Sequence, residues 1–207
     1  LNKIQNSYLV NYPLILIVKN LEYVDKILKE FKLKNYVVFL CKEYGSDIIS
    51  FLQSMYVMKL KYKIEYIYKI HTKSKRDWLN SCLNFLTEND MNYLKGGLYK
   101  NDSNCVGSIK YYSIKSVNGD SGKLIEKYSN ELDKTIFIGG TIFFSDMKLI
   151  ERIFRFLKYR NYKMYFLNNM YDMGGIHFRK SPAHFLERLF GLITLDKEKE
   201  YNNLLQC

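Results

Sequence analysis

Short apolar runs alternate with helical apolar stripes over the first 70 residues, and this alternation constrains the fold more than any other feature. Residues 13–18 form a β-branched apolar run, and apolar side chains then recur at helical spacing from 21 to 31. Residues 36–40 repeat the strand pattern, 48–58 the helical pattern and 64–70 the strand pattern. This order predicts crossover units on an open, mostly parallel sheet flanked by helices, which is an α/β fold.

After residue 70 the pattern is less regular, and a polar stretch from 99 to 133 is expected to hold loops. The further elements expected from apolar spacing are one strand within 135–144 and three helices, at 78–86, 147–157 and 183–193. No Pro-, Gly- or Ser-rich tract marks a linker. The sequence therefore predicts one domain over residues 1–195 and a charged C-terminal tail at 196–207.

The composition restricts the classes of protein to which the chain can belong. Hydrophobic residues make up 47% of the 207 positions, and no run approaches the roughly 18 apolar residues of a membrane span. The first residues lack a signal-peptide pattern and the 4 cysteines form no CxxC pair, so we expect a cytoplasmic protein with reduced thiols. The formal net charge of +11 favours an anionic partner, although codon bias toward lysine would give the same excess.

Polar and basic side chains follow the apolar run at 64–70, where a strand is expected to end. They are His71, Thr72, Lys73 and Lys75. Because ligands of open α/β sheets bind beyond the carboxyl ends of strands, these residues are candidates to meet a substrate. Lysine donates to phosphate, and histidine and threonine orient a hydroxyl or a phosphate oxygen. The alternatives are a solvated basic loop before the next helix and a nucleic-acid patch that continues from the lysines at 59–63.

Paired glycines interrupt the apolar run at 138–144. Gly139 and Gly140 remove side chains from a predicted strand, which indicates close approach of the backbone to a ligand. A β-bulge or a tight contact between helix and sheet is the structural alternative.

The predicted helix at 183–193 has a polar face of unusual composition. His184, Glu187 and Arg188 share one face at helical spacing, while the opposite face is apolar. A carboxylate there could act as a base and an arginine could pair with phosphate. An ordinary surface arrangement of neighbouring charges is the alternative.

Common cofactor motifs are absent from the sequence. It contains no GxGxxG, GxxxxGK[ST] or GxSxG, which argues against dinucleotide oxidoreductases, P-loop enzymes and ordinary α/β-hydrolases. The three histidines do not occur at HExxH spacing, and no Asp-x-Asp pair occurs, so a dedicated metal site is not expected.

Three segments taken in order resemble the rhamnan synthesis protein F family, whose members build rhamnose-rich surface polysaccharides. The segments are KIHTKS at 69–74 with Trp78 shortly after, GTIFF at 140–144 and AHFLERLFG at 183–191. The chain departs from the family pattern at Arg179 and Lys180, where family members carry Asp-Gly. The resemblance implies an inverting glycosyltransferase module of the nucleotide-sugar-binding type called GT-A.

The resemblance also implies roles for individual residues. Glu187 is expected to deprotonate the acceptor hydroxyl, with Asp172 as the second candidate. His71, Thr72 and Lys73 are expected to neutralise the leaving diphosphate in place of a metal ion. The residues expected to bind the nucleotide-diphosphate sugar are His71, Thr72, Lys73, Lys75, Gly139, Gly140, His184 and Arg188.

The expected partners are a nucleotide sugar, carrying rhamnose or another deoxyhexose, and a glycan or lipid-linked glycan acceptor, which is compatible with peripheral membrane contact. A requirement for Mn²⁺ or Mg²⁺ stays open. One alternative is a non-catalytic module that binds a nucleotide sugar or a glycan. The second is a basic protein that binds single-stranded nucleic acid, suggested by lysines at 59–75 interleaved with Tyr62, Tyr66 and Tyr68. No nucleic-acid-binding motif is visible, so nucleic acid is the less favoured partner.

Overall fold

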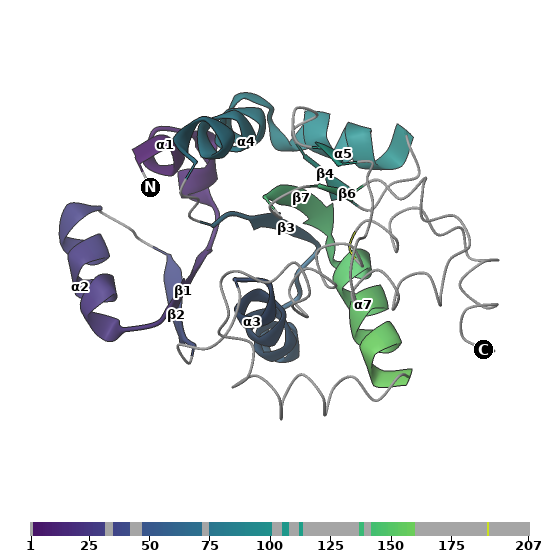
Figure 1. Ribbon diagram of the computed structural model, residues 1–207, viewed down its shortest axis with the longest axis horizontal. Helices are drawn as coiled ribbons and strands as arrows, with labels where there is room; N and C mark the ends of the chain where they lie inside the picture. The colour runs from purple at the N-terminus through teal and green to yellow at the C-terminus, as the bar shows by residue number, and fades with distance from the viewer. Residues whose placement is uncertain are drawn as a thin grey trace.

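The computed structural model describes residues 2–31, 35–41, 47–71, 75–100, 105–107, 112–113, 137–138, 142–159 and 190. Figure 1 shows a small sheet in the middle of the molecule with helices on both sides. Helices α4 (Arg76–Glu88) and α5 (Met91–Lys100) lie on one side, and α3 (Asp47–Lys61) and α7 (Met147–Tyr159) lie on the other. This mixture of helix and strand agrees with the expected α/β class at a coarse level.

The first crossover unit has the predicted form. Strands β1 (Leu14–Val18) and β2 (Tyr36–Leu40) pair in parallel, and α2 (Leu21–Glu30) lies between them in the chain. The side chain of Asn20 accepts a hydrogen bond from a backbone N–H in the first turn of α2, which fixes where the helix begins. Val24 of α2 packs against the buried side chains of β1.

A three-stranded antiparallel sheet occupies the middle of the molecule. Strand β7 (Phe143–Asp146) lies between β3 (Tyr66–Lys69) and β4 (Cys105–Val106). In the register of β3 with β7, Lys69 is opposite Phe143. Two segments singled out in the sequence therefore lie next to each other in one sheet.

The expectation of one mostly parallel sheet is wrong for the described strands. β1 pairs with β2 in parallel, but the pairings of β3 and β4 with β7, and of β5 (Tyr112–Ser113) with β6 (Phe137–Ile138), are antiparallel. These strands also fall into separate sheets. The physical reason is that apolar periodicity reports which side chains are buried, whereas strand direction depends on the partner strand, which the pattern does not identify.

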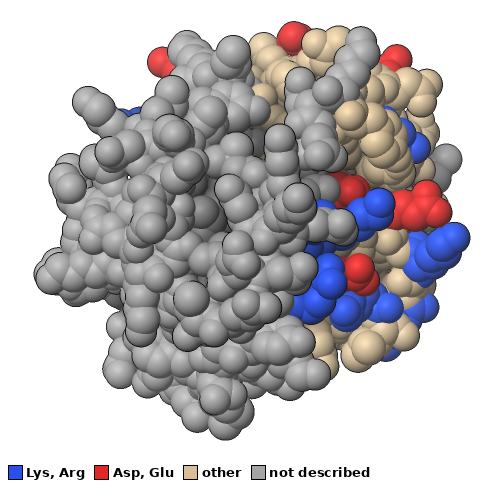
Figure 2. All heavy atoms as spheres, turned by 90° about the vertical axis from the view of Figure 1, so that its right-hand side faces the viewer, with Lys and Arg blue, Asp and Glu red and all other residues tan. Residues whose placement is uncertain are grey.

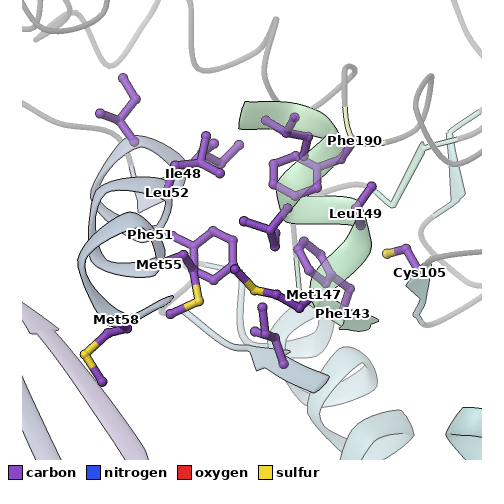
Figure 3. Packing of buried hydrophobic residues seen from close by; sticks show 14 residues of the cluster. Ile48, Phe51, Leu52, Met55, Met58, Cys105, Phe143, Met147, Leu149 and Phe190 are labelled. Carbon is purple, nitrogen blue, oxygen red and sulfur yellow. The ribbon is translucent and has the colours of Figure 1, made fainter. Parts of the chain in front are cut away.

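The three-stranded sheet separates two hydrophobic clusters because successive side chains of a strand point to opposite faces. Ile67 and Phe143 belong to the cluster shared with α3 and α7, part of which is drawn in Figure 3. Phe144 belongs to the cluster shared with α4 and α5, against which Tyr66 and Tyr68 pack. Both faces of this sheet are therefore covered by helices.

Tyr8 connects the N-terminal segment to α4 through its hydroxyl group. This residue begins the 3-10 helix η1 (Tyr8–Asn11), and its hydroxyl lies 2.9 Å from the carbonyl oxygen of Leu86 and 2.6 Å from that of Asn89. Within the short helix α1 (Asn2–Gln5), Lys3 donates to the side chain of Asn84.

The predicted helices at 21–31, 48–58, 78–86 and 147–157 correspond to α2, α3, α4 and α7. The prediction missed α5, which lies just before the polar stretch, overlaps it only at residues 99–100, and contains Gly96 and Gly97, residues that disfavour helix. The strand predicted within 135–144 appears as β6 and the beginning of β7.

Several predictions fall outside the described residues. The helix predicted at 183–193 is described only at Phe190, which is helical, and both the domain boundary at 195 and the tail at 196–207 lie outside. Among the helices that the structure does describe, none has the length and apolar character needed to cross a membrane.

Candidate functional site

Strand β3 carries a lysine into the interior of the molecule. Lys69 is the last residue of the strand and lies on the same face as the buried Ile67, and only 3% of its side chain is exposed. A buried ammonium group without a counter-ion is very costly. The carboxylate of Asp47, in the first turn of α3, supplies the counter-ion, with its Oδ2 atom 2.6 Å from Nζ of Lys69.

His71 approaches the same carboxylate oxygen. Its Nε2 atom lies 3.6 Å from Oδ2 of Asp47, and 15% of its side chain is exposed. This distance is too long for a hydrogen bond, but it is an ion-pair distance when the imidazole is protonated. Asp47, Lys69 and His71 are called the polar cluster from here on.

Helix α3 holds Lys69 from two directions. Asp47 and Phe51 are four residues apart, so they lie on the same face of the helix. The Nζ atom of Lys69 is 5.5 Å from the centroid of the Phe51 ring, within the range of a cation–π interaction. The position of Asp47 in the first turn is also favourable for a carboxylate, because the helix dipole is positive there.

Phe51 also belongs to an aromatic cluster with Phe143 and Phe190. The ring centroid of Phe51 is 6.1 Å from that of Phe143 and 6.4 Å from that of Phe190, and the centroids of Phe143 and Phe190 are 5.2 Å apart. Phe190 is 4% exposed. Figure 3 shows the three rings together between α3 and α7. The ring of Phe51 is thus the common neighbour of three residues, Lys69, Phe143 and Phe190. They come from the three segments 69–74, 140–144 and 183–191, one from each.

Of the predicted site residues, the structure describes His71 and Lys75. His71 joins the polar cluster, and Lys75 is an exposed residue directly before α4, where its side chain makes no capping hydrogen bond. The structure therefore does not place Lys75 in the polar cluster. The predicted site residues outside the described ranges are Thr72, Lys73, Gly139, Gly140, Asp172, His184, Glu187 and Arg188.

Sequence reasoning missed Asp47 and Lys69. The signal for Lys69 is present in the strand YIYK, because alternation puts residue 69 on the same face as the apolar residue 67. A lysine on a buried face needs an acidic partner, but no sequence pattern identifies which carboxylate supplies it. Asp47 comes from a different element, 22 positions away in the chain.

The donor set at the end of β3 does not suit a divalent metal ion. Mg²⁺ prefers several oxygen ligands, whereas the polar cluster offers one carboxylate that is already paired with an ammonium group. Across the part of the chain that the structure describes, no three His, Cys, Asp or Glu residues are grouped so that they could hold a metal. The polar cluster is therefore assigned no metal-binding role.

Two of the three tyrosines that suggested nucleic-acid binding are packed against the sheet. The ring of Tyr66 stacks on Phe144 at 5.6 Å, and the ring of Tyr68 lies 4.8 Å from the same phenylalanine. A hydrogen bond between the hydroxyls of Tyr66 and Tyr99 raises the pKa of Tyr66 to about 12. These rings stabilise the protein's own core, and of the three only Tyr62 is largely exposed.

The described surface carries both signs of charge. Figure 2 shows lysine and arginine side chains gathered in one area of the face that lies to the right in Figure 1, with acidic side chains among them. A continuous cationic track, as used to bind a nucleic-acid backbone, is not visible on the described part of this face.

The chain was compared with known protein families, with curated proteins and with solved structures, and none of the three comparisons found a match.

Proposed function

We propose that the protein is an inverting glycosyltransferase that moves a sugar, rhamnose or another deoxyhexose, from a nucleotide-diphosphate donor to a glycan acceptor in surface polysaccharide or glycoprotein synthesis. The observation that carries this proposal is the contact between three distant segments. Lys69 is opposite Phe143 in the sheet, and the rings of Phe51 and Phe143 both contact Phe190. Segments that resemble one family in sequence are thus neighbours in space, which supports a shared site.

The proposed reaction places charge at the end of β3. The acceptor hydroxyl attacks the anomeric carbon, and the bond from this carbon to the diphosphate breaks with its electron pair remaining on the diphosphate. His71, Thr72 and Lys73 neutralise the charge that develops there, and stabilisation of this kind is the largest contribution in many enzymes. Gly139 and Gly140 let the donor sugar lie against the backbone, and Lys75, His184 and Arg188 complete the binding residues.

Chain connectivity supports Glu187 as the base that takes the proton of the acceptor hydroxyl. Phe190 is held by Phe51 and Phe143, and three residues of extended chain span at most about 11 Å. This limit applies to Glu187, which precedes Phe190 by three positions, but Asp172 is too distant in the chain to be restrained in the same way. Glu187 is therefore the first candidate and Asp172 the second.

Donor binding is tested by thermal unfolding of the protein with a panel of nucleotide sugars, each with and without Mn²⁺. A donor that binds the folded state raises the melting temperature by mass action. The same plate shows whether binding depends on the metal. If no nucleotide sugar changes the melting temperature under either condition, the proposal is contradicted.

Catalysis is tested by measuring sugar transfer with Lys73→Ala and Glu187→Gln. We expect Glu187→Gln to lower kcat by about 100-fold or more, because general base catalysis typically contributes that much. Lys29→Ala and Glu151→Gln remove exposed charges from α2 and α7 and serve as controls with unchanged activity. Unchanged turnover in both site variants would remove the proposed roles.

Two other outcomes would favour the alternative functions. Donor binding without transfer to any acceptor would favour a non-catalytic binding module. A steeply salt-dependent affinity for single-stranded nucleic acid would favour a nucleic-acid-binding protein.

A further inference from the structure

Helix α3 leaves the hydrophobic core along its length. Its residues from Ile48 to Leu52 are all buried. In its last turns an apolar strip is exposed instead, formed by Tyr56, Val57 and Leu60, which share one face of the helix. Leu60 is 70% exposed. Single apolar side chains are common on protein surfaces, whereas a contiguous apolar strip indicates an interaction surface.

Lysines border the apolar strip on both sides. Because successive residues of a helix are rotated by about 100°, Lys59 and Lys61 project to opposite sides of Leu60. The set Tyr56, Val57, Lys59, Leu60 and Lys61 is called the α3 patch from here on. It combines apolar side chains in the middle with positive charge at both margins.

Helix α7 packs against one margin of the α3 patch. The ring of Phe154 meets the ring of Tyr56 edge to face, with the centroids 5.7 Å apart. The Nζ atom of Lys59 lies 5.3 Å from the centroid of the Phe154 ring, within the range of a cation–π interaction. These contacts fix one side of the patch between two packed helices, while Val57 and Leu60 stay exposed.

The charges that follow α3 leave the patch positive. Lys63 and Glu65 come directly after the helix and form an exposed ion pair at 3.5 Å, so their charges offset each other. The excess positive charge at this end of the helix therefore comes from Lys59 and Lys61.

We propose that the α3 patch attaches the protein to an anionic membrane surface. Val57 and Leu60 would enter the boundary between headgroups and acyl chains, and the ammonium groups of the two lysines would lie among the lipid headgroups. Charge complementarity favours this occupant, because a second copy of the chain would bring like charges together. A nucleic-acid backbone would leave the apolar strip without a partner. The inference goes beyond the proposed function and does not depend on it.

The experiment measures co-sedimentation of the full chain with phosphatidylcholine vesicles, with and without about one third of phosphatidylserine. We expect binding to the vesicles that contain phosphatidylserine, and weaker binding as the salt concentration rises from about 0.1 M to about 0.5 M. Absence of binding to the anionic vesicles would overturn the proposal. Equal binding to both kinds of vesicle would also overturn it, since the lysines would then have no role.

Substitutions in the α3 patch separate the apolar contribution from the charged one. Leu60→Gln should lower vesicle affinity by about tenfold, because a leucine side chain no longer leaves water. Lys59→Gln with Lys61→Gln should lower it by roughly 20- to 30-fold, since each lysine near an anionic surface contributes about fivefold. Lys61→Gln alone leaves the contact between Lys59 and Phe154 in place and should lower affinity by about fivefold.

Matched controls come from α2. Leu21 is 57% exposed but has acidic neighbours, Glu22 and Asp25, so Leu21→Gln should leave vesicle affinity unchanged. Lys26→Gln with Lys29→Gln removes the same net charge from another helix and should also have little effect. Equal losses in the α2 and α3 variants would show that overall charge drives the binding, and would overturn the proposal.

Two further results would assign the α3 patch to a different occupant and overturn the proposal. The first is self-association of wild type in gel filtration that Leu60→Gln abolishes, without vesicle binding. The second is binding of single-stranded nucleic acid that the lysine variants lose while vesicles are not bound. Vesicle binding needs neither a sugar donor nor an acceptor, so this inference can fail while glycosyl transfer stands, and the reverse.

Discussion

Asp146 joins β7 to α7 through its own side chain. It is the last residue of the strand, and its Oδ1 atom accepts a hydrogen bond from the backbone N–H of Leu149 at 3.1 Å. This N–H is one of the donors in the first turn of α7 that have no partner within the helix. Asp146 is thus the cap of the helix that covers the aromatic cluster, and partial burial raises the pKa of its carboxyl group above the ordinary value of 3.8.

Removing the cap should destabilise the protein measurably. We predict that Asp146→Ala lowers the free energy of unfolding by about 1 kcal/mol, the usual effect of losing an N-cap side chain. Asp146→Asn keeps a capping oxygen at the same position and should lose much less stability. Urea unfolding of the three proteins measures the difference, and equal losses in the Ala and Asn variants would show that the hydrogen bond to Leu149 is not the cause.

The raised pKa of Asp146 also predicts the sign of a pH effect. Because the pKa is higher in the folded state than in the unfolded state, the folded state binds the proton more tightly, and this stabilisation is lost as the pH rises through the folded pKa. The stability of wild type relative to Asp146→Asn should therefore be greater near pH 3.5 than near pH 7. Urea unfolding at both pH values checks this, and the opposite trend would contradict burial as the dominant cause.

Residues that act through the fold were harder to predict than residues that follow a strand. His71 could be singled out because it comes directly after an apolar run. Lys69 sits inside that run, and its burial becomes meaningful only when Asp47 is known to be 2.6 Å away. The pattern of one strand contains the need for a counter-ion, but the partner is determined by packing between α3 and β3.

At the scale of elements, helix α5 shows how local propensity and packing oppose each other. Its two glycines disfavour helix, yet Leu94 and Leu98 are buried one turn apart on the side that faces the sheet. Gly97 lies close to β4, because a Cβ atom there would be 3.3 Å from a methyl group of Val106. Gly96 faces open space, since a Cβ atom at this position would meet no other atom within 4 Å.

We predict that the two glycines respond differently to substitution by alanine. Gly96→Ala should stabilise the protein by roughly 0.5–1 kcal/mol, because alanine favours helix and meets no neighbouring atom. Gly97→Ala has the same gain in helix propensity but must displace Val106, so its stability should be lower than that of Gly96→Ala. Thermal unfolding of both variants tests the difference. A Gly97→Ala protein as stable as Gly96→Ala would show that α5 does not pack this closely on β4.

The elements divide into those that apolar periodicity determines and those that it does not. Helices α2, α3, α4 and α7 each carry a clear apolar stripe, and each was predicted close to its observed position. The antiparallel direction of β7 was not predictable, because the residues that pair with it, in β3 and β4, lie far away in the chain.

At the scale of the whole molecule, Phe190 connects the C-terminal part of the chain to the sheet. Its ring is buried against Phe51 and Phe143, the same phenylalanine pair that adjoins Lys69. The sequence predicted an apolar helix face that includes residue 190. It could not predict that this face would pack beside the strand that leads to His71, because that contact joins residues more than 100 positions apart.

Loss of the Phe190 ring should therefore affect the entire fold. We predict that Phe190→Ala lowers the free energy of unfolding by about 3 kcal/mol or more, as is usual for a buried phenylalanine. Tyr93→Ala is the control, because Tyr93 is 64% exposed and its loss should change stability by less than about 0.5 kcal/mol. A Phe190→Ala protein as stable as the control would mean that the C-terminal segment does not pack on α3 and β7.

The strand end at His71 and the segment that carries Glu187 are proposed to form one donor site. The chain has 3 histidines, His71, His177 and His184, and the first and last are assigned to this site whereas His177 is not. The most direct measurement is NMR of histidine-labelled protein during titration with the nucleotide sugar that gives the largest thermal shift. We predict that the signals of His71 and His184 move together with one dissociation constant while His177 stays unchanged. Movement of His71 or His184 alone would contradict a shared site.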